Sequence, residues 1–260
     1  MQLIDTHTHL YLDEFEADRR VVIERAINKN IQRFLLPNID TETIEPMLKL
    51  CKEFPDNCLP MLGLHPTSVK VDWKTQLESF EQMLFSNNHP FIAIGEIGLD
   101  FYWDKSFAEA QTNALRIQFD WAKNLDLPVA IHTREAFPEM LDEISKAQDG
   151  RLKGVLHCFT GNLSEAQRAV DLGFLLGIGG VLTYKKSTLP EIISQIDIKH
   201  LILETDAPFL PPVPYRGKRN ESAYMIETAL KLATIKQLSQ EEIARQTTQN
   251  AIELFKLKQL

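Results

Sequence analysis

Cysteine is scarce in this chain: Cys51, Cys58 and Cys158 make an odd number and show no CxxC spacing. A disulfide framework and a zinc ribbon are therefore disfavoured, and a reducing cytoplasm is the expected location. No uncharged apolar run approaches the length that crosses a bilayer, so we expect no membrane association. The first residues lack a basic segment followed by an apolar one, so we expect no signal peptide.

Positive charge is also in deficit, since 28 lysines and arginines face 36 acidic residues, for a formal net charge of −8. This balance argues against a protein that coats nucleic acid through a broad basic surface. It leaves open an enzyme that grips a few phosphates locally, with metal ions supplying positive charge. We expect modest affinity for long polyanions and a monomeric protein.

Short apolar segments alternate with longer amphipathic ones along the whole chain. Eight strands are expected, over Leu3–His7, Arg33–Pro37, Leu59–Leu64, Phe91–Glu96, Val129–His132, Gly154–Cys158, Phe174–Ile178 and Leu201–Glu204. Helices are expected over Glu14–Asn28, Thr41–Phe54, Trp73–Ser86, Phe107–Leu125, Ser164–Leu172, Ser222–Lys236 and Gln240–Phe255. Such strands are typical of parallel sheets buried on both faces. We predict one α/β domain over residues 1–260, a (β/α)8 TIM barrel.

The helix expected over Ser164–Leu172 has recognisable ends. Ser164 stands where an N-cap belongs and Gly173 where a C′ residue belongs.

The first expected strand ends in the segment Asp5-Thr-His-Thr-His9. Residues i and i+2 of a strand face the same way, so His7 and His9 project together. Two converging imidazoles are natural ligands of a divalent metal. Chance spacing is the alternative, and the other strand ends decide between the two.

Histidines and carboxylates follow several of the other strands. These residues are His65, Glu96, His132, His157 and Asp206. Five of the seven histidines lie at such positions, whereas His89 and His200 precede strands. Because barrel enzymes carry their chemistry at the C-terminal ends of the strands, we predict that these side chains gather at one site, where all of them except His65 ligate metal together with His7 and His9.

The predicted ligands outnumber the four of a closed tetrahedral site, so we expect two divalent ions, with Zn, Mn or Mg suited to this donor set. Glu96 is the expected bridge, since a carboxylate can hold two ions. The other ligands divide into His7, His9 and Asp206 for one ion and His132 and His157 for the other. Asp206 could also accept a proton from the attacking water.

Three further polar residues have two interpretations each. His65, whose backbone is restrained by Pro66, either contacts a substrate phosphate or leaving group or is a core or turn histidine. Arg134 either contacts a phosphate or forms a surface ion pair. Glu204 either shares the site or is a buried carboxylate satisfied by the backbone or by Arg134.

The proline-rich segment Pro208–Asn220 follows the last strand and carries Arg216, Lys218 and Arg219. These side chains either clamp a phosphate, for which the arginine fork is well suited, or form a solvated basic loop.

Other segments near the strand ends also leave alternatives. Tyr102 and Trp103 either stack a base or pack within their loop. The glycines of Gly177–Gly180 lack a dinucleotide pattern and favour a tight turn. Cys158 is expected to be a buried bystander.

The motifs together resemble the TatD-type metal-dependent deoxyribonucleases, a branch of the amidohydrolase superfamily. The matching blocks, in order, are Asp5-Thr-His-Thr-His9, Gly63-Leu-His-Pro66, Gly95-Glu-Ile-Gly-Leu-Asp100, His132-Thr-Arg134, His157-Cys-Phe-Thr-Gly161, Leu203-Glu-Thr-Asp-Ala-Pro208 and Arg216-Gly-Lys-Arg-Asn220. The resemblance covers essentially the whole chain and implies a TIM barrel, divalent metals with Mg usual in solution, and 3′–5′ exonuclease action on single-stranded DNA ends.

Two rival functions remain open at this point. Related sequences have been linked to aminoacyl-tRNA deacylation, so an ester or amide hydrolase of the same superfamily is one alternative. The other alternative is a metal-binding interaction protein without turnover. The apparently complete ligand set argues against it.

Overall fold

The computed structural model describes residues 2–259. Within them the strands are β1 Leu3–Asp5, β2 Ile31–Leu36, β3 Cys58–Pro60, β4 Ile94–Asp100, β5 Val129–Arg134, β6 Gly154–Leu156, β7 Phe174–Ile178 and β8 Leu201–Leu203. The α-helices are α1 Arg19–Asn28, α2 Ile44–Glu53, α3 Trp73–Leu84, α4 Ala108–Leu125, α5 Phe137–Ala147, α6 Leu163–Asp171, α7 Leu189–Ser194, α8 Met225–Lys236 and α9 Gln240–Phe255. None of these helices combines the length and apolar character needed to traverse a bilayer.

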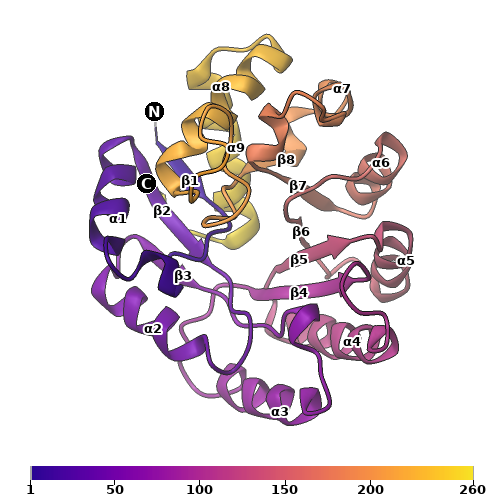
Figure 1. The fold of residues 1–260 in the computed structure, drawn as a ribbon. Coiled ribbons are helices and arrows are strands. Elements are labelled where there is room, and N and C mark those ends of the chain that lie inside the picture. Colours follow the sequence, from indigo (N-terminus) through magenta and orange to yellow (C-terminus); the bar gives the residue numbers. More distant parts are fainter. Residues whose placement is uncertain (1, 260) are drawn as a thin grey trace.

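The strands form a closed ring. Continuous parallel pairing runs through β1-β2-β3 and through β4-β5-β6-β7-β8. Single parallel bridges join the two sheets at both seams, Leu62 with Ile94 and Thr8 with Ala207. At the first seam the Gly95 N–H donates to the Leu62 carbonyl at 3.1 Å. Helices surround the ring (Figure 1), and the predicted (β/α)8 barrel is confirmed.

The core divides into two clusters because successive strand residues face opposite ways. The inner cluster comprises Ile4, Leu35, Met61, Ala93, Ala130, Val155, Ile202, Ala251, Ile252 and Phe255. Its members come from the strands, from residues adjoining them and from α9, so it fills the ring. The outer cluster packs the alternate strand residues against the surrounding helices.

Helix α9 covers one end of the ring. Its Asn250 side chain donates to the Leu201 carbonyl at 2.7 Å, and its Thr248 hydroxyl donates to the Gln2 carbonyl at 2.9 Å. Leu201 and Gln2 stand at or beside the beginnings of β8 and β1. The N-terminal end of the barrel is therefore closed, and the C-terminal strand ends remain for the site.

The helix predicted over Glu14–Asn28 is wrong in its first third. The chain instead forms a 3-10 turn over Asp13–Phe15, and α1 starts at Arg19. The Arg219 guanidinium donates to the Glu14 carbonyl at 2.6 Å, so a distant side chain contacts a carbonyl in the turn. A tertiary contact thus shapes this segment, which helical periodicity alone does not reveal.

The N-cap predicted at Ser164 is also wrong. Asn162 caps α6: its side chain accepts from the Glu165 N–H at 3.0 Å, and the Glu165 carboxylate accepts from the Asn162 N–H at 2.7 Å. This reciprocal capping box satisfies two N–H groups that the helix itself leaves unpaired. Gly173 has a φ of +85°, which agrees with the predicted C′ position.

Strands β4 and β5 extend beyond their predicted C-terminal ends. Asp100 pairs with Arg134, and Gly98 pairs with His132. The extension keeps Glu96 and Asp100 on one face of the same strand, since they are four positions apart. This face points toward the site described below.

A first prediction concerns the ion pair between α4 and α5. Arg116 donates to Glu143 at 2.6 and 2.9 Å, which lowers the pKa of Glu143 from 4.5 to about 2. Because the folded pKa lies below the ordinary value, the pair stabilises the fold above pH 4.5 and loses its effect as the pH falls toward 2. Glu143→Gln should lower the free energy of unfolding by roughly 1 kcal/mol near neutral pH.

Denaturant unfolding across this pH range measures the effect, and the two proteins should converge in stability at the acidic end. Glu78→Gln, at an exposed position of α3, is the matched control. Equal stability of wild type and Glu143→Gln near neutral pH would contradict the prediction.

Candidate metal centre

Glu96 lies at the middle of the histidine cluster, is 2% exposed and belongs to β4. Its Oε2 atom lies 3.1 Å from His7 Nε2 and 3.5 Å from His9 Nε2. Its Oε1 atom lies 3.2 Å from both His132 Nδ1 and His157 Nε2. The two carboxylate oxygens therefore face two different pairs of histidines, as a carboxylate between two ions would.

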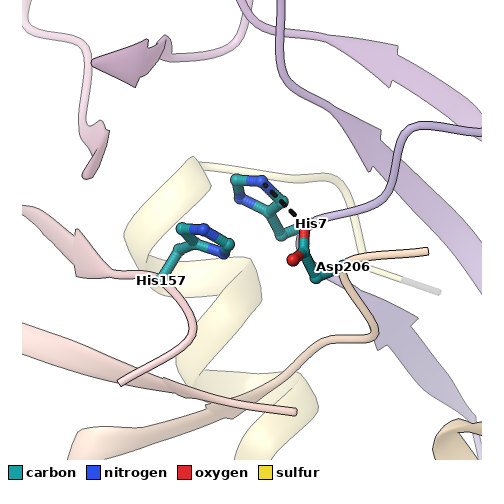
Figure 2. Close-up of side chains that lie close together, drawn as sticks. All are labelled: His7, His157 and Asp206. Atoms are coloured by element: carbon teal, nitrogen blue, oxygen red, sulfur yellow. Dashed lines mark ion pairs between the residues drawn. The ribbon is translucent and has the colours of Figure 1, made fainter. Parts of the chain in front are cut away.

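Asp206 joins the cluster from the segment after β8. Its Oδ1 atom lies 3.6 Å from His9 Nε2 and 3.9 Å from His7 Nε2. The rings of His7 and His157 are stacked, with centroids 3.7 Å apart, and Asp206 lies beside them (Figure 2). The ligand atoms of His7, His157 and Asp206 all lie within 4.8 Å of one another.

The hydrogen bonds of Tyr11 define which nitrogen of His9 carries the hydrogen. The Tyr11 hydroxyl donates to the Pro37 carbonyl at 2.6 Å, so its oxygen is left to accept from His9 Nδ1 at 2.9 Å. Neutral His9 therefore carries its hydrogen on Nδ1, and the Nε2 lone pair faces Glu96 and Asp206.

His132 has the opposite arrangement. Its Nε2–H donates to Asp100 at 2.9 Å, which leaves the Nδ1 lone pair facing Glu96. Asp100 is buried and also accepts from the Tyr102 N–H at 3.0 Å. A carboxylate that orients a histidine in this way is typical of metal sites.

Glu204 performs the corresponding role for His157. Its Oε1 atom lies 3.3 Å from His157 Nδ1 and also accepts from the Cys158 N–H. Gly177 makes room for the carboxylate, because a Cβ atom there would lie 2.3 Å from Glu204 Oε2. Among the described residues Glu204 makes no ion pair with Arg134. Within the segment Gly177–Gly180, Gly177 lies in strand β7 and Gly180 begins a 3-10 turn over Gly180–Thr183.

His65 differs from the other four histidines of the site. Its Nδ1 atom accepts from the Thr67 N–H at 3.1 Å, so the neutral ring carries its hydrogen on Nε2. That Nε2 atom lies 3.3 Å from Glu96 Oε1. Distance alone groups His65 with Glu96 and His132 as ligands. The tautomer makes it a hydrogen-bond donor instead.

The side chains of the cluster shift one another's pKa values. Burial by itself would raise the pKa of Glu96, but His7, His65 and His157 together lower it well below its usual range. Burial opposes protonation of His157, yet Glu96 and Glu204 raise its pKa well above the usual value. Both shifts favour the charged forms of the two side chains, so a cation that binds His157 competes with a proton.

The donor set fits divalent metal ions. Lone pairs of His9 and His132, fixed by Tyr11 and Asp100, point at carboxylate oxygens 3.2 to 3.6 Å away. Two electron-rich atoms facing each other in a buried site require a cation or a proton between them. Imidazole nitrogen with carboxylate oxygen suits Zn or Mn, and the carboxylates suit Mg.

A cavity of about 600 Å³ opens above the cluster. His9, His65, Glu96, His132, His157 and Asp206 all line it, together with Arg134, Trp103 and Phe209. Cys158 also lines it, and burial raises the pKa of its thiol, which disfavours the thiolate that a nucleophile needs.

The basic residues predicted to contact substrate have different locations and different partners in the structure. Arg134 lines the cavity and, within residues 2–259, its guanidinium has no acidic partner. The guanidinium of Arg216 instead lies 4.0 Å from the centre of the Tyr184 ring. Arg219 makes a double ion pair with Asp18, at 2.7 and 2.8 Å, and does not line the cavity. The expectation that Arg219 contacts substrate therefore gives way to a structural role.

Tyr11 and Asp100 are site residues that the sequence did not single out. Asp100 ends the motif Gly95–Asp100, and its spacing of four positions from Glu96 along β4 is a usable sequence signal. Tyr11 follows His9 by two residues, but its contact with Pro37 depends on the next strand and has no local signal.

The sequence and fold have close counterparts. The sequence model of the family described as TatD related DNase matches residues 4–256. An uncharacterized metal-dependent hydrolase of Bacillus subtilis, YabD, is 35% identical over 262 residues, covering 98% of this chain and 99% of that protein. Another from Escherichia coli K12, YjjV, is 31% identical over 255 residues, with 98% of each covered.

The crystal structure of YjjV, described as a TatD homolog, superposes with a TM-score of 0.93 at 30% identity and covers 98% of both chains. Barrel, cluster and relatives together define the class as a metal-dependent hydrolase. Within that class, the chain belongs to the TatD family.

A second prediction tests the orientation of His132. In Asp100→Asn the neutral amide oxygen accepts the His132 Nε2–H more weakly than the carboxylate does, so affinity for a divalent ion should fall roughly 10-fold to 100-fold. Calorimetric titration of metal-stripped protein with Zn or Mn measures this affinity. Asp104→Asn, at a half-buried position of the following loop, is the control. Unchanged affinity in Asp100→Asn would remove Asp100 from the site.

Proposed function

We propose that this hydrolase is a DNase that removes nucleotides from the 3′ ends of single-stranded DNA, using two divalent ions. The observation that carries the proposal is the placing of Glu96, with one carboxylate oxygen toward His7 and His9 and the other toward His132 and His157. This is the arrangement that two-metal phosphodiesterases use.

Two bound ions would supply Lewis acidity for the attack of water on phosphorus and neutralise charge on the phosphate. Asp206 would accept the proton that the attacking water loses. His65, which carries its hydrogen on Nε2, would donate a hydrogen bond from that nitrogen to a phosphate oxygen or to the departing oxygen.

Arg134 supports a phosphate substrate. The ring of Tyr102 lies 3.7 Å below its guanidinium and limits its motion. An ordered guanidinium at the cavity wall, with no acidic partner among residues 2–259, suits two-point binding of a phosphate. The family description as DNases points the same way.

Stepwise degradation of labelled strands tests the reaction. Metal-stripped protein is incubated with 3′- and 5′-labelled single strands, a small phosphodiester and a carboxylic ester, while Mg, Mn or Zn is added in turn. We expect successive loss from the 3′ end of the strands. Hydrolysis of the ester alone would overturn the proposal in favour of an ester or amide hydrolase, and metal binding without any turnover would indicate an interaction protein.

A third prediction concerns the bridging carboxylate. Glu96→Gln should reduce kcat by at least about 1000-fold, because one oxygen is replaced by an amide nitrogen that cannot ligate a metal. The thermal midpoint of the metal-stripped protein checks that the variant folds. Glu78→Gln again serves as the control. Metal-dependent cleavage near the wild-type rate in Glu96→Gln would refute the two-metal assignment.

A fourth prediction separates the two arginines. Arg134→Ala should raise KM about 10-fold with little loss of folding stability, since the side chain contacts substrate. Arg219→Ala should leave KM unchanged and lower the thermal midpoint, because the double ion pair with Asp18 is lost. Steady-state kinetics and thermal unfolding of both variants provide the measurement, and the reverse pattern would contradict both roles.

A further inference from the structure

Two exposed aromatic side chains lie at the mouth of the cavity. Trp103 is 70% exposed and Phe209 is 48% exposed. Both line the same cavity as Glu96 and Asp206. A single exposed apolar side chain needs no explanation, whereas two that share a polar cavity suggest a ligand with apolar faces.

The two rings come from opposite sides of the barrel. Trp103 lies three residues beyond the end of β4, and Phe209 lies in the segment after β8. In a closed ring of eight strands these two strands are four positions apart and therefore face each other across the axis. The cluster around Glu96 lies between them.

Backbone hydrogen bonds attach each aromatic residue to the cluster itself. The Trp103 N–H donates to Asp100 Oδ1 at 3.4 Å, and Asp100 also orients His132. The Phe209 N–H donates to the Asp206 carbonyl at 2.8 Å. The Phe209 carbonyl in turn accepts from the buried Asn220 side chain at 2.6 Å. The backbone at both aromatic residues is thus anchored to residues of the cluster or beside it.

Tyr102, for which base stacking is the expected alternative together with Trp103, has a different partner in the structure. Its face holds the Arg134 guanidinium at 3.7 Å, while Arg134 lies 5.3 Å from the Trp103 ring. Tyr102 therefore steadies the phosphate-binding arginine and leaves Trp103, the more exposed ring, for a ligand.

On the basis of the proposed phosphodiesterase function, we propose that Trp103 and Phe209 bind the nucleobases on either side of the scissile phosphate. A phosphate over the cluster would place its two flanking nucleotides toward the two rings. Aromatic side chains stack on any base, so the site takes an unpaired strand end without regard to sequence. Bases within a duplex are stacked on one another and are not available to the rings.

The experiment compares strands that differ only in their bases. Substrates are a single strand, the same strand with abasic residues at its last two 3′ positions, and a blunt duplex, each incubated with the metal-loaded enzyme. Wild type should cleave the complete strand about 10-fold to 100-fold faster, by kcat/KM, than the abasic strand. The duplex should be the slower of the two complete substrates.

In Trp103→Ala and Phe209→Ala the ratio of kcat/KM for complete and abasic strands should fall toward one. Trp103→Phe and Phe209→Leu provide variants of lower folding risk, of which the first should keep most of the preference. Phe85→Ala is the matched control, since Phe85 is 49% exposed and follows α3, outside the cavity. It should show the wild-type ratio.

The outcomes separate this inference from the function on which it rests. Equal cleavage of complete and abasic strands by wild type, or an unchanged ratio in both alanine variants, would overturn base stacking and leave the nuclease standing. Cleavage of no strand with Mg, Mn or Zn would overturn the proposed function and the inference together.

Discussion

The site depends on one buried carboxylate, Glu96, whose two oxygens are approached by nitrogens of five histidines. Glu96 is 2% exposed, and the histidine rings around it offset its charge and lower its pKa. Removing it would leave His7, His9, His132 and His157 crowded without a common counter-charge. The rest of the structure can be understood as the means of holding this carboxylate and these rings in register.

Ring closure is the first of these means. His7 stands near the beginning of the chain and Asp206 near its end, yet the Asp206 N–H donates to the His7 carbonyl at 2.9 Å across the β1–β8 seam. The inner cluster fills the ring and α9 closes its far end. The polar side chains are thereby confined to the remaining end, where strand extension at β4 and β5 adds Asp100 and Arg134.

Polar contacts made by the outer nitrogens of the histidine rings are the second means. Tyr11, Asp100 and Glu204 each engage the ring nitrogen of a histidine that faces away from Glu96. The same network extends outward, because Asp100 also binds the backbone of the loop that carries Trp103. The position of the cluster is therefore coupled to that of the loop that carries Trp103 through a few buried groups.

The sequence by itself determined the barrel and the six candidate ligands, since parallel strands must share an edge and their ends must meet there. It also identified His65 and Arg134, whose positions follow from the same geometry. Tertiary structure decided what local patterns cannot express. The Arg219 side chain pairs with Asp18 and does not line the cavity. Helix α1 begins at Arg19, later than predicted. Phe209 and Trp103, from opposite strands of the ring, line the same cavity. Spacing along one strand dictates which way a side chain points, whereas its partner on a distant segment depends on the closed fold.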